Sequence, residues 1–308
     1  LLGALAIAGR EDAERWGAER ARVAFVAMGR YGGRECSYAS DADVIALHEA
    51  VGGASDSEAA ASATAIVNRV KKLLGSATSQ LGIVVDLDLR PEGKNGPMSR
   101  TIASHEEYAQ RWASTWERQA AVRARPIGDG GLAQAARSLF ESMAYRDVSE
   151  AEVRDIRLLK ARMENERLPR GTEPARHVKL GPGGLTDVEW TIQLIQMRHG
   201  REVEALRTSS TTDAIAAARD AGLLGASDAE ILLNAWDLAT RIRAGNTLAT
   251  GRMSGVKLDV VPRDSAELGA LAAILGYGSG GLTALEEDWL RAARQARNVM
   301  ERAFWEQQ

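Results

Sequence analysis

Residues 29–43 read Gly-Arg-Tyr-Gly-Gly-Arg-Glu-Cys-Ser-Tyr-Ala-Ser-Asp-Ala-Asp, which joins a glycine-rich turn to two alternating aspartates. Apolar runs flank this stretch, so it predicts a strand, a tight turn, a short helix and a second strand. Residues two apart on a strand share a face, so Asp41 and Asp43 are expected to point the same way. Two such carboxylates repel each other unless a divalent cation lies between them, and Mg²⁺ prefers oxygen ligands. The stretch therefore predicts a magnesium site.

The glycine pair in this stretch, Gly32 and Gly33, permits a backbone turn that residues with a Cβ resist. A helix after the pair would direct free N–H groups and its positive dipole end toward an anion. The triphosphate of a nucleotide suits that position. A glycine pair alone is more often an ordinary turn, and only the combination with two apolar strands and the aspartates makes phosphate binding a specific prediction.

A third carboxylate is predicted from residues 83–89, which read as a strand with Asp86 and Asp88 on one face and apolar residues on the other. A salt bridge to Arg90 or to another arginine is the structural alternative. With Asp41 and Asp43 as ligands, Asp86 is the first choice for completing a two-metal site. Such a site stabilises the attacking and leaving oxygens of a phosphoryl displacement.

The length of the chain and its hydrophobic periodicity predict two dissimilar domains. With 308 residues, 45% of them hydrophobic, about two domains are expected. Strand and helix signals alternate up to residue 128, which predicts a mixed α/β sheet, and helical periodicity alone from residue 129 predicts an all-α bundle. The expected domains are therefore 1–128 and 129–308. The chain starts at Leu1, so we expect it to be part of a longer protein.

Composition argues against several classes of function. The net charge of -3 provides no global basic field, so no nucleic-acid partner is expected. A single cysteine, Cys36, cannot form an internal disulfide and fits a reducing compartment. No apolar run is long enough to span a membrane, so we expect a cytoplasmic protein without a membrane partner. The four histidines lack metal-ligand spacing.

Residues 27–44 closely resemble the signature of glutamine-synthetase adenylyltransferases, a branch of the nucleotidyltransferase superfamily. Blocks at residues 89–97, 111–126 and 179–190 agree with that family in the same order. The resemblance implies a nucleotidyltransferase-fold mixed sheet followed by a helical bundle. Family members have two similar catalytic halves: one attaches AMP to a tyrosine of glutamine synthetase, and the other removes it by phosphorolysis. The sequences of residues 43–49, 86–91 and 294–304 resemble the C-terminal, adenylylating half of actinobacterial members. Tyr31 departs from the pattern, because many members carry leucine at this position.

This resemblance implies an ATP- and Mg²⁺-dependent enzyme in which Asp41, Asp43 and Asp86 are catalytic residues and metal ligands. Asp86 would also favour deprotonation of the incoming tyrosine. Glutamine synthetase is the implied protein substrate, and its modification lowers its activity in nitrogen regulation. A PII-type signalling protein is a second implied partner. The residues expected to contact ATP are Gly32, Gly33, Ser40, Arg90, Lys94 and Lys179.

Two other functions and three structural readings remain open. The chain could catalyse phosphorolytic removal of AMP, which uses the same metals, or could be a non-catalytic module that binds a nucleotide or a partner. Thr186 and Glu189 have the spacing of a capping box, which would explain them without any function. Arg123 and Arg125 are either counter-charges to the triphosphate or arginines that bridge the core. A basic run of Arg154, Arg157, Lys160 and Arg162 is either a solvated helix face, which is the expected reading, or a face that docks an acidic partner.

Overall fold

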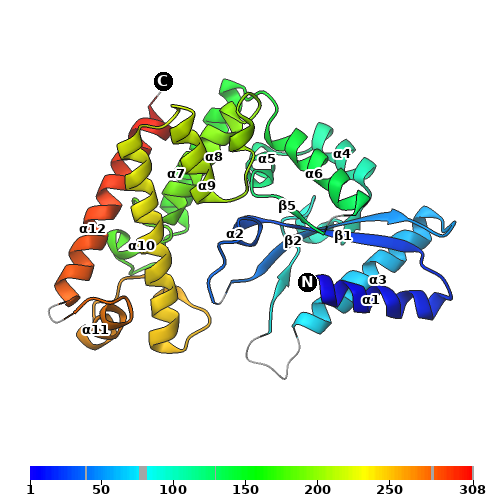
Figure 1. The fold of residues 1–308 in the computed structure, drawn as a ribbon, viewed down its shortest axis with the longest axis horizontal. Helices are drawn as coiled ribbons and strands as arrows, with labels where there is room; N and C mark the ends of the chain where they lie inside the picture. The colour runs from blue at the N-terminus through cyan, green and yellow to red at the C-terminus, as the bar shows by residue number, and fades with distance from the viewer. Residues whose placement is uncertain (39, 76–81, 129, 279–280, 307–308) are drawn as a thin grey trace. The chain divides into compact units, whose positions relative to one another are not determined.

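The computed structural model describes residues 1–38, 40–75, 82–128, 130–278 and 281–306 (Figure 1). The chain forms two compact units, and each has its own hydrophobic core. The first unit comprises Leu1–Cys36 and Ser40–Arg146, and the second lies mainly in residues 147–306. A mixed sheet with helices occupies the first unit and helices dominate the second, which confirms the predicted fold class.

The first unit is built on a five-stranded mixed sheet with the strand order β3-β2-β1-β5, in which β4 also pairs with β2. β1 runs antiparallel to both β2 and β5, whereas β2 runs parallel to β3 and β4. β3 therefore lies at the end of the main path, next to the strand that carries Asp43. The strands are β1 (Ala21–Ala27), β2 (Ala42–Ala50), β3 (Val85–Asp86), β4 (Ser99–Arg100) and β5 (Arg125–Ile127).

Helices cover both faces of this sheet (Figure 1). α1 (Leu2–Trp16) and α3 (Asp56–Leu74) pack on one face, where α3 begins with a capping box between Ser55 and Glu58. α6 (Gly131–Ala144) packs against β1, β2 and β5 from the other. Because α6 buries its apolar stripe on the sheet, the first unit continues to Arg146, beyond the expected boundary at residue 128.

Periodicity near residues 105–119 predicts a single helix, but this prediction is wrong because two helices occupy the region. α4 (Ile102–Arg111) ends where the N–H groups of Trp112 and Ala113 both donate to the Tyr108 carbonyl. α5 (Thr115–Ala121) then starts with a capping box between Ser114 and Glu117. The capping box is a local signal for the start of a new helix, so the helical region is divided in two.

The strand expected at residues 83–89 is also shorter than predicted, since β3 contains only Val85 and Asp86. The Asp86 carboxylate accepts a hydrogen bond of 2.7 Å from the Asp88 N–H, and the Arg90 N–H donates to the Leu87 carbonyl. Aspartate side chains commonly compete in this way with ladder hydrogen bonds. Asp88 therefore lies in a turn and not on the strand beside Asp86.

The second unit is a set of packed helices, in agreement with the helical periodicity of this part of the sequence. Trp289 is fully buried in its core and donates from its indole N–H to the Ala175 carbonyl at 2.8 Å. Within the described ranges of both units, no helix combines the length and the apolar character needed to cross a membrane. The helices are α7 (Glu150–Glu166), α8 (Leu185–His199), α9 (Thr211–Asp220), α10 (Ala226–Thr250), α11 (Ser265–Ile274) and α12 (Gly281–Met300), followed by a π-helical turn (Glu301–Trp305).

Candidate functional site

Two of the predicted carboxylates, Asp43 and Asp86, lie opposite each other in the parallel pairing of β2 with β3. Val44 and Val85 belong to the core under α1 and α3, so the alternation of side chains puts Asp43 and Asp86 together on the other face of the sheet. Both are half-buried. Asp41 is exposed and precedes the first residue of β2. The fold thus brings two of the three aspartates into register and leaves Asp41 where the strand begins.

Gly29 makes room for the Asp43 carboxylate. Its φ is +50°, and a Cβ at this position would lie 2.9 Å from Asp43 Oδ2. The Met28 N–H also donates to the Asp43 carbonyl at 2.9 Å, so the end of β1 and the start of β2 are tied together here. Sequence reasoning singled out Gly32 and Gly33 and missed Gly29, although a glycine directly after an apolar strand was the available signal.

The donor set fits a magnesium ion bound partly by its substrate. Among the described residues, no three His, Cys, Asp or Glu side chains are grouped closely enough to enclose a metal ion. Mg²⁺ usually takes only one or two protein carboxylates and fills its octahedron with waters and substrate phosphates. The Asp43 and Asp86 pair, with Asp41 two residues before Asp43, offers oxygen donors of this kind. Metal binding by the three aspartates stays a prediction.

The helix expected after the glycine pair is wrong. α2 (Gly29–Gly32) is a single turn that precedes Gly33, and no helix follows within residues 33–38 and 40–41. A Cβ on Gly32 would lie 1.9 Å from the Arg123 carbonyl oxygen, and one on Gly33 would lie 2.5 Å from Arg123 Nη2. The two glycines are therefore required by close packing against Arg123. A helix of four residues is too short to supply the predicted dipole for a phosphate.

Arg123 and Arg125 hold the glycine turn in place. Arg123 donates from Nε to the Gly29 carbonyl at 3.2 Å and is ion-paired with Glu35, and both side chains are nearly buried. Arg125 donates to the carbonyls of Gly32 at 2.8 Å and Tyr31 at 2.9 Å. Burial of its guanidinium lowers the pKa of Arg125. These contacts support the core-bridging reading of the two arginines over the phosphate reading.

The remaining predicted ATP contacts of the first unit lie in loops. Arg90 donates to the Leu87 carbonyl at 2.9 Å and to the Gly96 carbonyl at 3.2 Å, so it fixes the loop after β3. Lys94 is 81% exposed, and its ammonium lies 3.3 Å from the Asp88 carboxylate. Asp88 is also 3.8 Å from Arg90, so the salt-bridge alternative holds for Asp88. Ser40 is half-buried and its side chain is hydrogen-bonded to the Cys36 thiol.

Lys179 lies in the second unit, in the turn before α8. The N–H groups of Lys179 and Leu180 both donate to His177 Nδ1, at 3.3 and 3.1 Å. Within the described ranges, the Lys179 ammonium has no carboxylate within 4.0 Å. The capping box considered for Thr186 and Glu189 is wrong, because α8 starts after Gly184 and the Thr186 hydroxyl donates to the Lys179 carbonyl.

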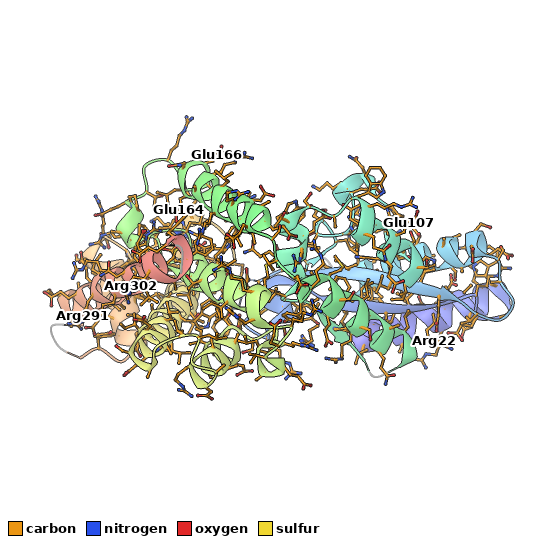
Figure 2. All side chains as sticks on the ribbon, turned by 90° about the horizontal axis from the view of Figure 1, so that it is seen from above. Arg22, Glu107, Glu164, Glu166, Arg291 and Arg302 are labelled. Atoms are coloured by element: carbon orange, nitrogen blue, oxygen red, sulfur yellow. The ribbon has the colours of Figure 1, made fainter. Side chains whose placement is uncertain are left out.

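A cluster of charged side chains, which includes the buried Lys160 and Asp187, contacts this turn through Gly183. Lys160 Nζ lies 2.5 Å from Asp187 and 2.6 Å from Glu164 (labelled in Figure 2), and the side chains of Lys160 and Asp187 are each 1% exposed. Arg297 lies 2.7 Å from Glu164 and 3.1 Å from Asp187, which also accepts the Gly183 N–H at 2.7 Å. The solvated face expected around Lys160 is wrong at this residue, because its ammonium is the centre of an interior ion cluster.

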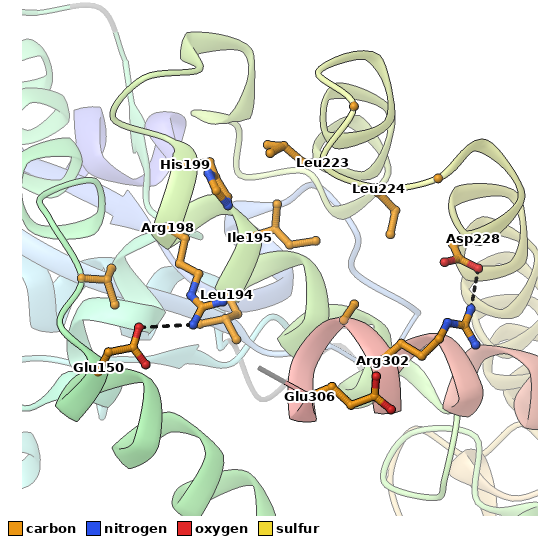
Figure 3. Close-up of a pocket in the computed structure, with 14 residues that line it drawn as sticks. Glu150, Leu194, Ile195, Arg198, His199, Leu223, Leu224, Asp228, Arg302 and Glu306 are labelled. Carbon is orange, nitrogen blue, oxygen red and sulfur yellow. Dashed lines mark hydrogen bonds and ion pairs between the residues drawn. The ribbon is translucent and has the colours of Figure 1, made fainter. Parts of the chain in front are cut away.

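A separate cavity of about 660 Å³ lies within the second unit (Figure 3). Ion pairs occupy its rim: Arg198 lies 3.7 Å from Glu150, and Arg302 lies 2.7 Å from Asp228. None of the predicted site residues lines it. Its apolar wall is formed by Leu194, Ile195, Leu223 and Leu224.

Comparison with known proteins identifies the family. Residues 4–139 match the family model for glutamate-ammonia ligase adenylyltransferase. A bifunctional glutamine synthetase adenylyltransferase/adenylyl-removing enzyme of Streptomyces coelicolor is 45% identical over 296 residues, which is 95% of this chain and 29% of the relative. The chain belongs to the glutamine synthetase adenylyltransferase family.

Other members of the adenylyltransferase family match over similar spans. The relatives of the same name from Leifsonia xyli and Mycobacterium marinum are 42% and 39% identical over 99% and 96% of this chain, which correspond to 29% and 30% of their own lengths. The chain thus spans less than a third of the length of these relatives. Residues 157–304 also match the family model for GlnD PII-uridylyltransferase, so the helical unit is similar to a part of that second family.

Proposed function

We propose that this chain transfers AMP from ATP to a tyrosine of glutamine synthetase and so represents the adenylylating half of its longer relatives. The observation that carries the proposal is the register of Asp43 with Asp86 beside Gly29, in a chain that belongs to the adenylyltransferase family. This pairing gives clustered oxygen donors, which a purely structural strand pair does not need.

Asp43, Asp86 and Asp41 would hold Mg²⁺, which when bound neutralises phosphate charge and lowers the pKa of the attacking hydroxyl. Activation is required because the pKa of a free tyrosine is near 10, so only about one molecule in a thousand is ionised at neutral pH. Asp86 orients the acceptor hydroxyl and favours loss of its proton. The bond from the phenolic oxygen to the α-phosphorus forms, the bond to the bridging oxygen breaks, pyrophosphate leaves, and the proton passes to water.

The remaining predicted ATP contacts have different roles in this proposal. Lys94 provides a cation for the phosphates, since its side chain is largely exposed, and the contact expected from Lys179 of the second unit stays a prediction. Gly32 and Gly33 shape the turn on which the nucleotide lies, and Ser40 faces it from the start of β2. Arg90 acts by fixing the loop after β3.

Phosphorolytic removal of AMP from adenylylated glutamine synthetase is the second candidate. The names of the relatives include an adenylyl-removing activity, and both reactions displace a group at the same α-phosphorus. In this direction inorganic phosphate attacks, ADP leaves, and the tyrosine takes up a proton. In either direction we propose a cytoplasmic enzyme with glutamine synthetase as protein substrate and a PII-type protein as a candidate regulator.

Transfer of label from α-labelled ATP to purified glutamine synthetase tests the proposal. We expect labelled synthetase with Mg²⁺ and none with the Asp41→Asn, Asp43→Asn variant, whose folding is checked by circular dichroism. Full transfer by the folded double variant would contradict the metal site. Release of ADP from adenylylated synthetase and phosphate, without forward labelling, would support the second candidate. Nucleotide binding that survives without divalent metal and without either reaction would favour a non-catalytic module.

A further inference from the structure

An exposed valine, Val84, shares the face of the sheet that carries the aspartates. The Ala42 N–H donates to the Val84 carbonyl at 2.8 Å as part of the pairing of Ala42 with Val85, so the Val84 backbone adjoins the start of β2. Val85 and Leu87 are buried in the core under α1 and α3. Because side chains alternate between the two faces along an extended segment, Val84 lies on the same face as Asp86. Its side chain is 58% exposed, next in register to Asp41.

The two sides of β2 are not equivalent for a displacement at phosphorus. On the β1 side the Asp43 carboxylate meets Gly29 and the glycine turn, whereas on the other side lies β3, at the end of the main strand path. Attacking and leaving oxygens stand roughly in line on opposite sides of the phosphorus. With the nucleotide on the glycine turn, as in the proposed function, the acceptor approaches from the side of β3.

We propose that Val84 is a specificity-determining residue that contacts the aromatic ring of the acceptor tyrosine. A tyrosine that brings its hydroxyl to the aspartates must also place its apolar ring beside this face of the sheet. The branched aliphatic side chain of Val84, next to the aspartates, provides an apolar contact for this ring and does not compete with them for the metal. This inference rests on the proposed function and adds a residue that recognises the acceptor tyrosine.

Ile83 offers a matched control. It precedes Val84, is 47% exposed and is also apolar, but its N–H donates to the Leu74 carbonyl at the end of α3, which packs on the sheet face opposite the aspartates. The test compares Val84→Ala with Ile83→Ala. The readouts are the Kd for unmodified glutamine synthetase measured without ATP or Mg²⁺, and the KM values for the synthetase and for ATP. Thermal melting verifies that each variant is folded.

We expect Val84→Ala to raise the Kd and KM for the synthetase about fivefold, which is the scale of losing part of one apolar contact, and to leave the KM for ATP unchanged. Ile83→Ala should change each quantity by less than about twofold. Equal effects of the two variants, or an effect of Val84→Ala on the KM for ATP alone, overturn the inference while labelling by the wild type still supports the proposed function. A wild type that neither attaches nor removes AMP overturns both.

Discussion

Asp43 and Asp86 are Cα partners across the parallel pair of β2 and β3, whereas Asp88 lies in the turn that follows. We therefore expect Asp86→Asn to lower AMP transfer at least about 100-fold, because an amide supplies one neutral oxygen in place of a charged metal ligand. The amide of this variant keeps an oxygen for the Asp88 N–H, so the turn is preserved. Asp88→Asn is the control and should retain activity within about threefold. Equal losses in initial rates of labelling would contradict the assignment of Asp86.

The contact of Gly29 with Asp43 predicts a change in metal requirement. Gly29→Ala adds a Cβ 2.9 Å from Asp43 Oδ2 and should raise the Mg²⁺ concentration for half-maximal activity about tenfold. Gly53→Ala is the matched control, since Gly53 also has a positive φ of +78° but nothing lies within 4 Å of its added Cβ. Both variants should lose about 1 kcal/mol of stability through backbone strain. A normal Mg²⁺ titration for Gly29→Ala would show that this carboxylate does not hold the metal.

Loss of Arg125 should destabilise the first unit. Arg125→Met removes the guanidinium donors to the carbonyls of Gly32 and Tyr31, the second of which keeps the Arg34 N–H at 3.3 Å, at an expected cost of about 2 kcal/mol in the free energy of unfolding. Arg22 (labelled in Figure 2) forms an exposed ion pair with Glu49, so Arg22→Met should change stability by less than about 0.5 kcal/mol. Urea unfolding followed by circular dichroism compares the two. Similar midpoints would mean that the turn does not depend on Arg125.

The burial of His105 predicts that the stability of the first unit decreases in acid. Burial, with a smaller effect of the Arg100 charge, lowers its pKa from 6.5 to about 4. The unfolded chain therefore binds this proton at higher pH than the folded chain, so stability is complete above pH 6.5 and falls as pH decreases toward 4, by roughly 3 kcal/mol. His105→Phe, which keeps an aromatic ring against Phe140, should flatten this slope, whereas His199→Gln should retain it. Parallel slopes for His105→Phe and wild type in urea unfolding at pH 4.5 to 7 would exclude His105 as the cause.

The buried charge cluster predicts a strong dependence on Lys160. Lys160→Met leaves the buried Asp187 carboxylate with less compensation and should cost about 3–5 kcal/mol. The control is Arg291→Met, because Arg291 is 61% exposed and pairs only along its own helix with Asp288. Tryptophan fluorescence during urea unfolding reports the difference through Trp289, which is buried in the same unit. Stability of Lys160→Met equal to that of the control would mean that the cluster contributes little.

Local patterns in the sequence predicted the parts of the site that depend on local chemistry. Alternation along β2 and β3 identified Asp43 and Asp86, and helical periodicity identified most of the second unit. The parallel register between Asp43 and Asp86 joins residues far apart in the chain, so no local signal could give it. The same limit explains Gly32, which is a glycine because Arg123 packs against it.

Residues with two chemically reasonable partners were the main source of error. Asp86 could continue the strand or accept the Asp88 N–H, and the side-chain bond prevailed. Thr186 and Glu189 have the spacing of a capping box, yet the Thr186 hydroxyl donates to Lys179 instead. Lys160 lies in a basic run, but its side chain is buried in an ion pair with Asp187, which is on another helix. In each case the choice depends on tertiary neighbours that the sequence does not place.

The hydrogen bonds from Arg123 and Arg125 to the glycine turn have a consequence for how the protein folds. β1 and β2 are close in sequence and can form early, but the carbonyls of Gly29, Tyr31 and Gly32 gain their arginine donors only when β5, more than ninety residues later, docks on β1. Contacts of such long sequence separation form slowly. A chain emerging during synthesis would therefore have its aspartates long before the turn beside them becomes rigid, so catalytic competence should be among the last properties that this unit acquires.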